Sequence, residues 1–408
     1  NSGRRETASE ATTPNNTIKL TPALVYPSGG TLTPLSGSTS YGASTPTGTW
    51  LNSGVIWRQI GSITLQPELS DNDYLSAGDL VVKTPSSTIG RFYPDHFSLT
   101  SSSVTNACVA GAFSYMGQPA LGLSFQLQAQ DANNNILTNY STSYGTLPSF
   151  SYVSENANDG QGASLNGRVS SGSGAAVNAS GGNIQMTSST AIFSRKAPNL
   201  DADGPFTSLQ LGLDITDSFD GRSLQGKNMD HTSTGTCSGA SCTSVAIGSP
   251  LNMRYGRLRL DDAFGPETYP LDVNFITEYW VGNRFVLNTA DSCTQVLRSA
   301  ITYPAGPIST DSNRTVALTG GSTQGTYTNL TASNVGFNGG TAGQKFTSPS
   351  GAKGVFIVSV DTTILPWLSF DWDQGKTAGP DAKLPNATFS FGSYRGHDRI
   401  IYWRERLQ

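Results

Sequence analysis

Four cysteines carry the most distinctive chemistry of this sequence: Cys108, Cys237, Cys242 and Cys293. An even number of cysteines, in a chain with few other reactive side chains, favours disulfides in an oxidising compartment. Cys237 and Cys242 are close in sequence, and Gly239 between them lets the backbone fold back over a short span. We pair these two, which leaves Cys108 for Cys293, and the other two connectivities remain open.

The same cysteines suggest two other chemistries, zinc binding and nucleophilic catalysis. No histidine stands at zinc-ligand spacing from a cysteine, so a disulfide pair is the better interpretation. The segment Gly235-Thr-Cys237-Ser-Gly239 has the shape of a nucleophile elbow with cysteine in the nucleophile position. An elbow needs a buried strand before it and a helix after it, whereas the flanks here are HTST and ASCTS. We therefore interpret the segment as a disulfide loop.

Two acidic segments resemble calcium loops, in which carboxylates at alternate positions converge on the cation. The better candidate site consists of Asp371, Asp373 and Asp381, with Gly375 in the third oxygen position. The segment DANNN at 131–135 lacks the glycine and the distal glutamate of a full loop, so a polar hairpin turn explains it better. We expect no cofactor, with calcium at Asp371, Asp373 and Asp381 as the single exception.

No group of residues predicts a catalytic site. The three histidines of the sequence have no second histidine at ligand spacing. Asp214, Asp217 and Asp220 are typical of solvated turn carboxylates. Paired carboxylates for glycoside hydrolysis converge only in space, and nothing in the sequence singles out a pair. We expect a protein that is not an enzyme.

Six tryptophans could stack on sugar rings. Trp57 and Trp403 lie inside apolar segments, where a tryptophan is usually a core residue. Trp372 stands between two aspartates, so we expect it to be partly exposed and to be the best candidate for contact with a ligand.

The composition of the sequence argues against nucleic acid as a partner and against a membrane span. Charged residues make up 13% of the chain, against about a quarter in an ordinary soluble domain, and 45 glycines contribute to a turn-rich composition. The formal net charge is −4, and aromatic residues are nowhere interleaved with Lys or Arg, which argues against nucleic acid as a partner. No run of about 18 apolar residues predicts a membrane span.

The candidate residues above are expected to lie on strands or in the turns between them, because apolar and polar residues alternate along much of the chain. The alternation is clear over 121–129, 209–215 and 271–279, which indicates antiparallel sheets with one buried face. After Trp280 the turn residues Gly282 and Asn283 predict a tight hairpin. The segments GVFIVSV and RIIYWRE, near the end of the chain, are typical of buried sandwich strands.

We therefore predict an all-β fold of tandem antiparallel β-sandwich (Ig-like) domains with long Ser/Gly/Asn-rich loops. The expected domains are 17–92, 93–250 and 251–408, after a flexible or partner-ordered tail at 1–16. Breaks are expected between Gly90 and Asp95 and between Gly248 and Asn252. The stretch from Asn156 to Asn183 is either a long loop or a pair of poorly paired strands.

Several segments, in order, cover most of the chain from about residue 50. They are VIWRQIGSITLQ (55–66), GRFYPDHFSLTS (90–101), FSYMGQPALGLSFQLQAQDANNNILTNY (113–140), DGPFTSLQLGLDITD (203–217), RYGRLRLDDAFGPETYPLDVNFITEYWVGNRFVLNTADSC (254–293), and DWDQG (371–375) with FGSYRGHDRIIYWRE (391–405). Taken together, these segments resemble the MshQ-type family, whose members are encoded with the machinery of the mannose-sensitive haemagglutinin (MSHA) class of type IV pili.

The resemblance implies a surface-exposed or pilus-associated bacterial protein and carries over no enzyme activity. The family pattern around Cys108 and Cys293 favours pairing these two residues. The family often has a fuller acidic loop where this sequence has Asp371 to Gly375, and the departure at Gly375 weakens the case for calcium.

Three functions follow as hypotheses for an extracellular protein of the bacterial cell surface. The first is an adhesin-like or tip-associated component of an MSHA-like pilus, with other surface or pilus proteins as partners. The second is a filament or sheath subunit that binds copies of itself by strand addition of residues 1–16. The third is a secreted glycan-binding or glycan-active protein, with surface glycans as its partners.

Overall fold

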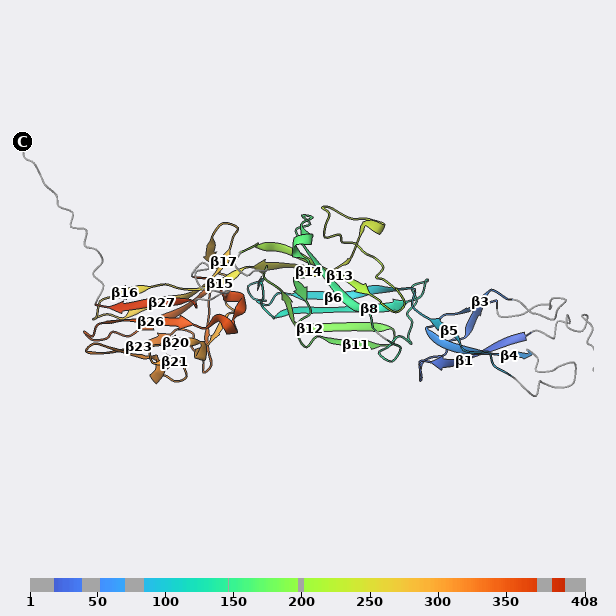
Figure 1. Cartoon of the computed structure of the whole chain (residues 1–408), viewed down its shortest axis with the longest axis horizontal. Helices are drawn as coiled ribbons and strands as arrows, with labels where there is room; N and C mark the ends of the chain where they lie inside the picture. The colour runs from blue at the N-terminus through green and yellow to red at the C-terminus, as the bar shows by residue number, and fades with distance from the viewer. Residues whose placement is uncertain are drawn as a thin grey trace, which may run out of the picture.

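The computed structural model describes residues 18–38, 52–69, 84–145, 147–196, 202–372 and 384–392. Every regular element among them is a strand or a short 3-10 helix, which confirms the all-β fold class. Figure 1 shows three β units in a line, with the first strands at one end and the last strands at the other. Within the described ranges, no helix is long and apolar enough to cross a membrane.

The first unit holds an antiparallel sheet in the order β1-β4-β5 and a separate two-stranded ribbon. Its strands are β1 (Ile18–Tyr26), β4 (Gly61–Leu69) and β5 (Ile89–Phe92), with β2 (Leu35–Gly37) and β3 (Val55–Trp57) in the ribbon. Trp57 is buried, as its apolar context predicts, and its ring stands edge-on to Phe92 at 5.0 Å. The predicted tail at 1–16 lies outside the described residues.

The second unit is a sandwich of two sheets. One sheet has the order β10-β12-β8-β6, with β11 also paired to β12, and the other has the order β7-β14-β13-β9. The first sheet consists of β6 (His96–Thr105), β8 (Leu121–Gln130), β10 (Val169–Ser170), β11 (Ala176–Ser180) and β12 (Asn183–Phe193). The second consists of β7 (Ser114–Tyr115), β9 (Ser149–Asn156), β13 (Phe206–Thr216) and β14 (Val245–Arg254).

The alternation of apolar residues fixes which face of each strand is buried. On β8 the residues from Leu121 to Ala129 alternate strictly between buried and half-buried positions, as the sequence predicts. Leu123 and Phe125 of β8 share one core cluster with Leu209 and Leu211 of β13 from the facing sheet. The outer face of β8 is thereby left to polar side chains.

Two boundaries can be compared with the sequence. The chain changes sheet between β5 and β6, within the expected range from Gly90 to Asp95. It does not break between Gly248 and Asn252, because β14 runs through these residues, and the change of sheet lies at Tyr255. Between Asn156 and Asn183 a short 3-10 helix (Gly162–Leu165) is followed by the short paired strands β10 and β11, so this stretch is not simply a loop.

The third unit is also a sandwich, with sheets in the orders β15-β17-β25-β23-β22 and β16-β27-β26-β20-β21. The first sheet comprises β15 (Gly256–Leu260), β17 (Leu271–Trp280), β22 (Thr315–Leu318), β23 (Gly321–Tyr327) and β25 (Thr341–Phe346), with β18 (Phe285–Leu287) on β17. The second comprises β16 (Ala263–Gly265), β20 (Ile301–Tyr303), β21 (Gly306–Pro307), β26 (Gly354–Val360) and β27 (Asn386–Phe391). A small pair, β19 (Gln295–Leu297) and β24 (Asn334–Gly336), lies apart from both sheets.

The hairpin expected after Trp280 is confirmed. Strands β17 and β18 pair antiparallel, with Trp280 opposite Phe285, and Gly282 adopts a φ of +94° in the connecting turn. The expected strand GVFIVSV is β26, whereas RIIYWRE lies outside the described residues.

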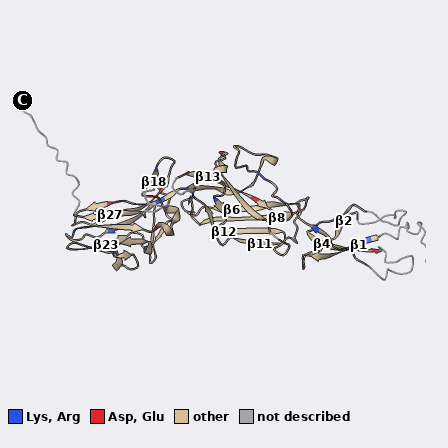
Figure 2. Cartoon of the chain, in the orientation of Figure 1, with Lys and Arg blue, Asp and Glu red and all other residues tan. Residues whose placement is uncertain are grey.

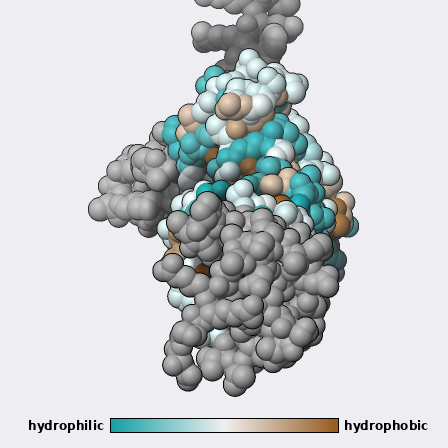
Figure 3. Space-filling view, turned by 90° about the vertical axis from the view of Figure 1, so that its right-hand side faces the viewer, coloured by the Kyte–Doolittle hydropathy of each residue, from teal (hydrophilic) through white to brown (hydrophobic). Residues whose placement is uncertain are grey.

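The low charge of the sequence is visible on the folded chain. In Figure 2 the Lys, Arg, Asp and Glu residues are few and scattered over the three units. Seen along the long axis from the end that holds β1, the visible described surface is mostly hydrophilic, with isolated hydrophobic residues (Figure 3).

Candidate functional site at the joint between the second and third units

The cysteines form two disulfides, Cys108–Cys293 and Cys237–Cys242, which are the two pairs favoured by the sequence. The first joins the second unit to the third across 185 positions, and the second closes a loop of 5. Since Cys237 is disulfide-bonded and is followed by a 3-10 turn (Gly239–Ser241), this cysteine is not set up as a nucleophile.

The first calcium-like segment is a hydrogen-bonded turn. One oxygen of Asp131 accepts the backbone N–H groups of Asn133 and Asn135, both at 2.9 Å. The other oxygen forms an ion pair with Arg58 of the first unit at 3.3 Å. Burial alone would raise the pKa of Asp131, but the hydrogen bonds from Asn135, Asn133 and Arg58 outweigh it and lower this pKa. The carboxylate therefore stabilises a turn and links it to the first unit.

The second calcium-like segment is only partly described. Asp371 is buried, with 8% of its surface exposed, whereas Asp373 and Asp381 lie outside the described residues. Trp372 is partly exposed, and its ring lies edge-on to Phe370 and against the Arg257 guanidinium. Among the residues that the structure describes, no cluster of His, Cys, Asp and Glu could hold a metal ion. Calcium at this segment stays a prediction.

The three aspartates of the 214–220 region do not converge. Asp214 pairs with Lys227 at 3.0 Å, and Asp220 pairs with Arg91 at 2.7 Å. Asp217 accepts the backbone N–H groups that follow it in a turn. Each carboxylate has its own structural partner, so the three do not form an acid–base pair.

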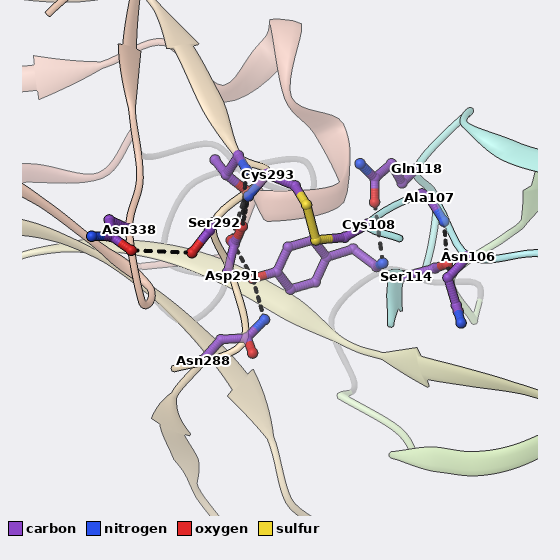
Figure 4. The surroundings of a disulfide bond; sticks show 12 residues. Asn106, Ala107, Cys108, Ser114, Gln118, Asn288, Asp291, Ser292, Cys293 and Asn338 are labelled. Atoms are coloured by element: carbon purple, nitrogen blue, oxygen red, sulfur yellow. Dashed lines mark hydrogen bonds between the residues drawn. A yellow bond between two sulfur atoms is a disulfide. The ribbon is translucent and has the colours of Figure 1, made fainter. Parts of the chain in front are cut away.

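The most elaborate polar site of the described residues surrounds the long disulfide. Figure 4 shows Cys108–Cys293 beside Asp291, a carboxylate with no exposed surface. Asp291 accepts the Tyr115 hydroxyl at 2.8 Å and both the backbone N–H and the hydroxyl of Thr294, at 2.9 and 2.7 Å. The Cys293 N–H donates to it at 3.1 Å. A buried carboxylate is tolerated when its oxygens are hydrogen-bonded in this way.

Tyr115 and Asp291 come from different units, so this network crosses the joint. The Tyr115 hydroxyl also accepts a hydrogen bond from the Asn288 amide at 2.6 Å. The Asn288 amide oxygen accepts a hydrogen bond from the Arg254 guanidinium. Burial, followed by the nearby Asp291 carboxylate, raises the pKa of Tyr115 well above its ordinary value, so the hydroxyl stays protonated and donates.

The two units also exchange core residues at the joint. Cys108, Phe113 and Tyr115 precede β8 in the chain, yet they belong to the hydrophobic core of the third unit. Tyr255, at the start of the third unit, belongs to the core of the second. Gly111 fits into the turn before Phe113 because a Cβ there would stand 2.3 Å from the Ala290 carbonyl oxygen.

A single arginine also bridges the two units. Arg195 follows β12, and its guanidinium donates to the carbonyls of Ser369 and Gly256 at 2.6 Å each and also to the carbonyl of Trp367. It lies over the Tyr255 ring at 4.3 Å and is only 9% exposed. One planar cation thus satisfies three carbonyls of the third unit from the end of a strand in the second.

Sequence reasoning did not identify Tyr115, Asp291 or Arg195. The sequence does predict a turn at Asp291. An aspartate two residues before Cys293 is suited to a turn in which its side chain accepts the N–H groups that follow. Arg195 stands next to Lys196 in SRKAP, and that pattern predicts an ordinary solvated loop. Their common role depends on contacts between distant segments.

Comparison with known proteins identifies two consecutive matches to family models. The fourth domain of DUF6701 matches residues 254–406, and the third domain of DUF6701 matches residues 59–244. The boundary between them agrees with the change of sheet at Tyr255. A search of the curated proteins finds no match.

Among solved structures, the similarities are at low sequence identity and low TM-score. The Escherichia coli adhesin FdeC is 15% identical, with a TM-score of 0.29 over 92% of this chain and 87% of that chain. The Yersinia pseudotuberculosis adhesin InvE is 12% identical, with a TM-score of 0.21 over 72% and 58%. Domains 4–9 of the surface layer protein SbsC are 11% identical, with a TM-score of 0.18 over 92% and 47%.

Proposed function

We propose that this chain, which carries the third and fourth domains of DUF6701 in succession, is a non-enzymatic, adhesin-like protein of the bacterial cell surface. In this function the linked β units hold a binding surface away from the cell. The finer assignment, to an MSHA-like type IV pilus, is part of the proposal and rests on the sequence resemblance to the MshQ-type family.

The observation that carries the proposal is the closed joint between the second and third units. The Cys108–Cys293 disulfide, the Asp291 network beside it and Arg195 together fasten the two units. A disulfide between units is typical of oxidising compartments outside the cytoplasm. A fastened joint is of use to a protein that transmits pulling force between a surface and a ligand, because it keeps two units from separating.

The low charge supports the same function. Charged residues are 13% of the chain, and the solvent sides of β8 and β12 in the second unit present hydroxyl and amide groups. Such a surface forms many weak hydrogen bonds and avoids strong ionic attraction to unrelated molecules. The filament hypothesis depends on residues 1–16, which lie outside the described residues, and it stays a prediction.

The test uses the source bacterium with and without the gene. We expect antibodies to the protein to label intact cells, and mass spectrometry of the purified protein to find both disulfides formed. Loss of the gene should reduce attachment to surfaces at least threefold, and restoring it should restore attachment. Immunogold labelling of pili tests the finer assignment.

Two results would contradict the proposal. One is a protein that is inaccessible on intact cells and has four free thiols. The other is unchanged attachment after loss of the gene. Labelling of the cell body without labelling of pili would remove the pilus assignment and keep the adhesin-like function.

A further inference from the structure

One sheet face of the second unit carries no charge. None of its strands β6, β8, β11 and β12 contains Asp, Glu, Lys or Arg. Their single titratable residue, His96, is buried with 3% of its surface exposed. We call the solvent side of these four strands the neutral face, and Figure 2 shows β8, β11 and β12 without charged residues. Edge strands often carry charges that prevent unwanted pairing, and the edge strands β6 and β11 of this face have none.

The strand register places hydroxyl and amide side chains in rows across the neutral face. One row consists of Ser101, Gln126, Gln185 and Asn178. The next row consists of Ser103, Ser124, Thr187 and Ala176. From Gly122 to Gln130 the face extends about 26 Å at the rise of a β-strand. These rows present donors and acceptors in a regular array.

Hydrogen bonds within the neutral face fix the amides in place. The Gln126 and Gln128 amides both donate to the Asn183 carbonyl oxygen, at 2.7 and 3.2 Å. Gln130 donates to the Gln128 carbonyl oxygen at 3.1 Å, and Ser98 donates to Gln130 at 2.8 Å. Side chains that are ordered before binding lose less conformational entropy when a ligand arrives.

A hollow of about 360 Å³ lies at one end of the neutral face. This volume is within the range of small-molecule sites, which starts near about 300 Å³. Ser103, Ser124 and Thr187 line this hollow, and none of their hydroxyls bonds another residue of the described part of the chain. Gly122 and Gly174 also line the hollow and leave room in it.

A second hollow, of about 220 Å³, lies at the other end, where the second unit meets the first. Ser180 belongs both to the neutral face and to the lining of this hollow. Thr31, Asn139 and Ser141 line it as well, and neither hollow has a charged lining residue. An uncharged polar track therefore connects the two hollows along the sheet.

We propose that the neutral face binds an uncharged polysaccharide, laid along the strands from one hollow to the other. The proposal deepens the adhesin-like function and rests on it, since it names the ligand class of the surface that the joined units would present. Sugar hydroxyls donate and accept at once, as do the hydroxyls and amides of this face.

Other ligand classes fit the neutral face less well. A polyanion would gain no ion pair from strands without Lys or Arg. A protein partner usually needs aromatic or Arg anchors at the centre of the contact, and the central rows of this face hold Ser, Gln, Asn and Thr.

The test measures binding of the purified 408-residue chain to immobilised dextran, mannan and galactan, with alginate and heparin as anionic comparisons. We expect binding to at least one neutral polysaccharide and none to the anionic pair. Gln185→Glu and Ser124→Asp each place a charge on the neutral face without touching the core, and we expect each to weaken binding at least tenfold. Thr207→Asp, at an exposed position of β13 in the opposite sheet, is the matched control and should bind like the wild type.

Three results would overturn the proposal: no binding to any neutral polysaccharide, binding to the anionic pair alone, or unchanged binding by both face variants. Self-association that both face variants abolish would instead assign the face to a second copy. If the variants attach to surfaces like the wild type while loss of the gene prevents attachment, the adhesin-like function stands and this ligand assignment fails. If the protein is absent from the cell surface, the adhesin-like function fails whatever the binding assay shows.

Discussion

At the scale of single residues, Asp291 has the most demanding surroundings in the joint. It is fully buried, and its oxygens accept from Tyr115, Cys293 and Thr294. Its removal would leave four donor groups without an acceptor, three of them on the buried residues Tyr115 and Thr294, whereas loss of one donor leaves the carboxylate with the others. Removing Asp291 should therefore cost more stability than removing the Tyr115 hydroxyl.

We predict that Asp291→Ala lowers the free energy of unfolding by about 3 kcal/mol, because an unsatisfied buried donor is costly. Tyr115→Phe should lower it by about 1 to 2 kcal/mol, since only the Asn288 amide then loses its acceptor. Urea denaturation followed by tryptophan fluorescence measures both. Val109→Ala, at a position 75% exposed beside Cys108, is the control and should stay within about 0.5 kcal/mol. Equal losses for Asp291→Ala and Tyr115→Phe would contradict this account of the network.

Residue chemistry was predictable where it is local. The turn at Asp131 follows from an aspartate and the N–H groups just after it, and the disulfide of Cys237 and Cys242 follows from their short spacing. Asp291 was not predictable as a joint residue, because its partner Tyr115 is 176 positions away. A carboxylate that binds a distant hydroxyl has the same sequence signature as one that binds water.

At the scale of elements, the 3-10 helix Pro366–Leu368 and the start of β15 are held by one side chain. Arg195 donates to carbonyls in both segments, and Gly256 has no side chain because a Cβ would meet the Tyr115 ring at 2.4 Å. The planar guanidinium reaches three acceptors that point in different directions, which a lysine ammonium on a flexible stem cannot do in the same way.

We predict that Arg195→Lys weakens the joint by about 1 to 3 kcal/mol, since at least one buried carbonyl loses its donor. Hydrogen exchange should become faster in β15 and at Ser369, and it should stay unchanged in β23 and β25, which Arg195 does not contact. Lys196→Arg, at the exposed neighbouring position, is the control and should exchange like the wild type. Faster exchange over the whole third unit would indicate general destabilisation instead.

Long strands were predictable and short ones were not. A period of two over ten residues, as in β8 and β17, leaves no competing interpretation. The strand β7 has two residues, Ser114 and Tyr115, which pair with β14 as a parallel partner. The break expected between Gly248 and Asn252 came from turn residues that β14 accommodates as a bulged part of the strand.

At the scale of the whole molecule, the two disulfides close loops of very different length. Cys108 and Cys293 are 185 positions apart, whereas Cys237 and Cys242 are 5 apart. In the chain-entropy model the stabilisation grows with the length of the closed loop. The long disulfide should therefore contribute most of the covalent stabilisation.

We predict that the double variant Cys108→Ser, Cys293→Ser loses roughly 5 kcal/mol and that Cys237→Ser, Cys242→Ser loses roughly 2 kcal/mol, as upper values from the chain-entropy model. Guanidinium denaturation of each double variant against the wild type measures the difference, and the short-loop variant is the matched control. A larger loss for the short loop than for the long one would contradict the entropic account.

A string of β units was predictable from composition and turn spacing, but how the units join was not. Alternation identifies a buried face without identifying the face that it packs against. Phe113 and Tyr115 have the pattern of core residues, and nothing in FSYMG shows that their core is the third unit's. The neutral face was missed for a related reason. Its polar residues come from four separate strands, and only the strand register shows that they form one surface.

The exchange of core residues at the joint limits how the two units can be separated in a gene. A gene fragment that begins at Tyr255 would encode the third unit without Cys108, Phe113 and Tyr115, and its core would have a hole where they belong. A fragment that ends at Arg254 would leave the second unit without Tyr255. Each of the two units therefore lacks part of its core without the other, and we expect recombination to preserve them as a pair.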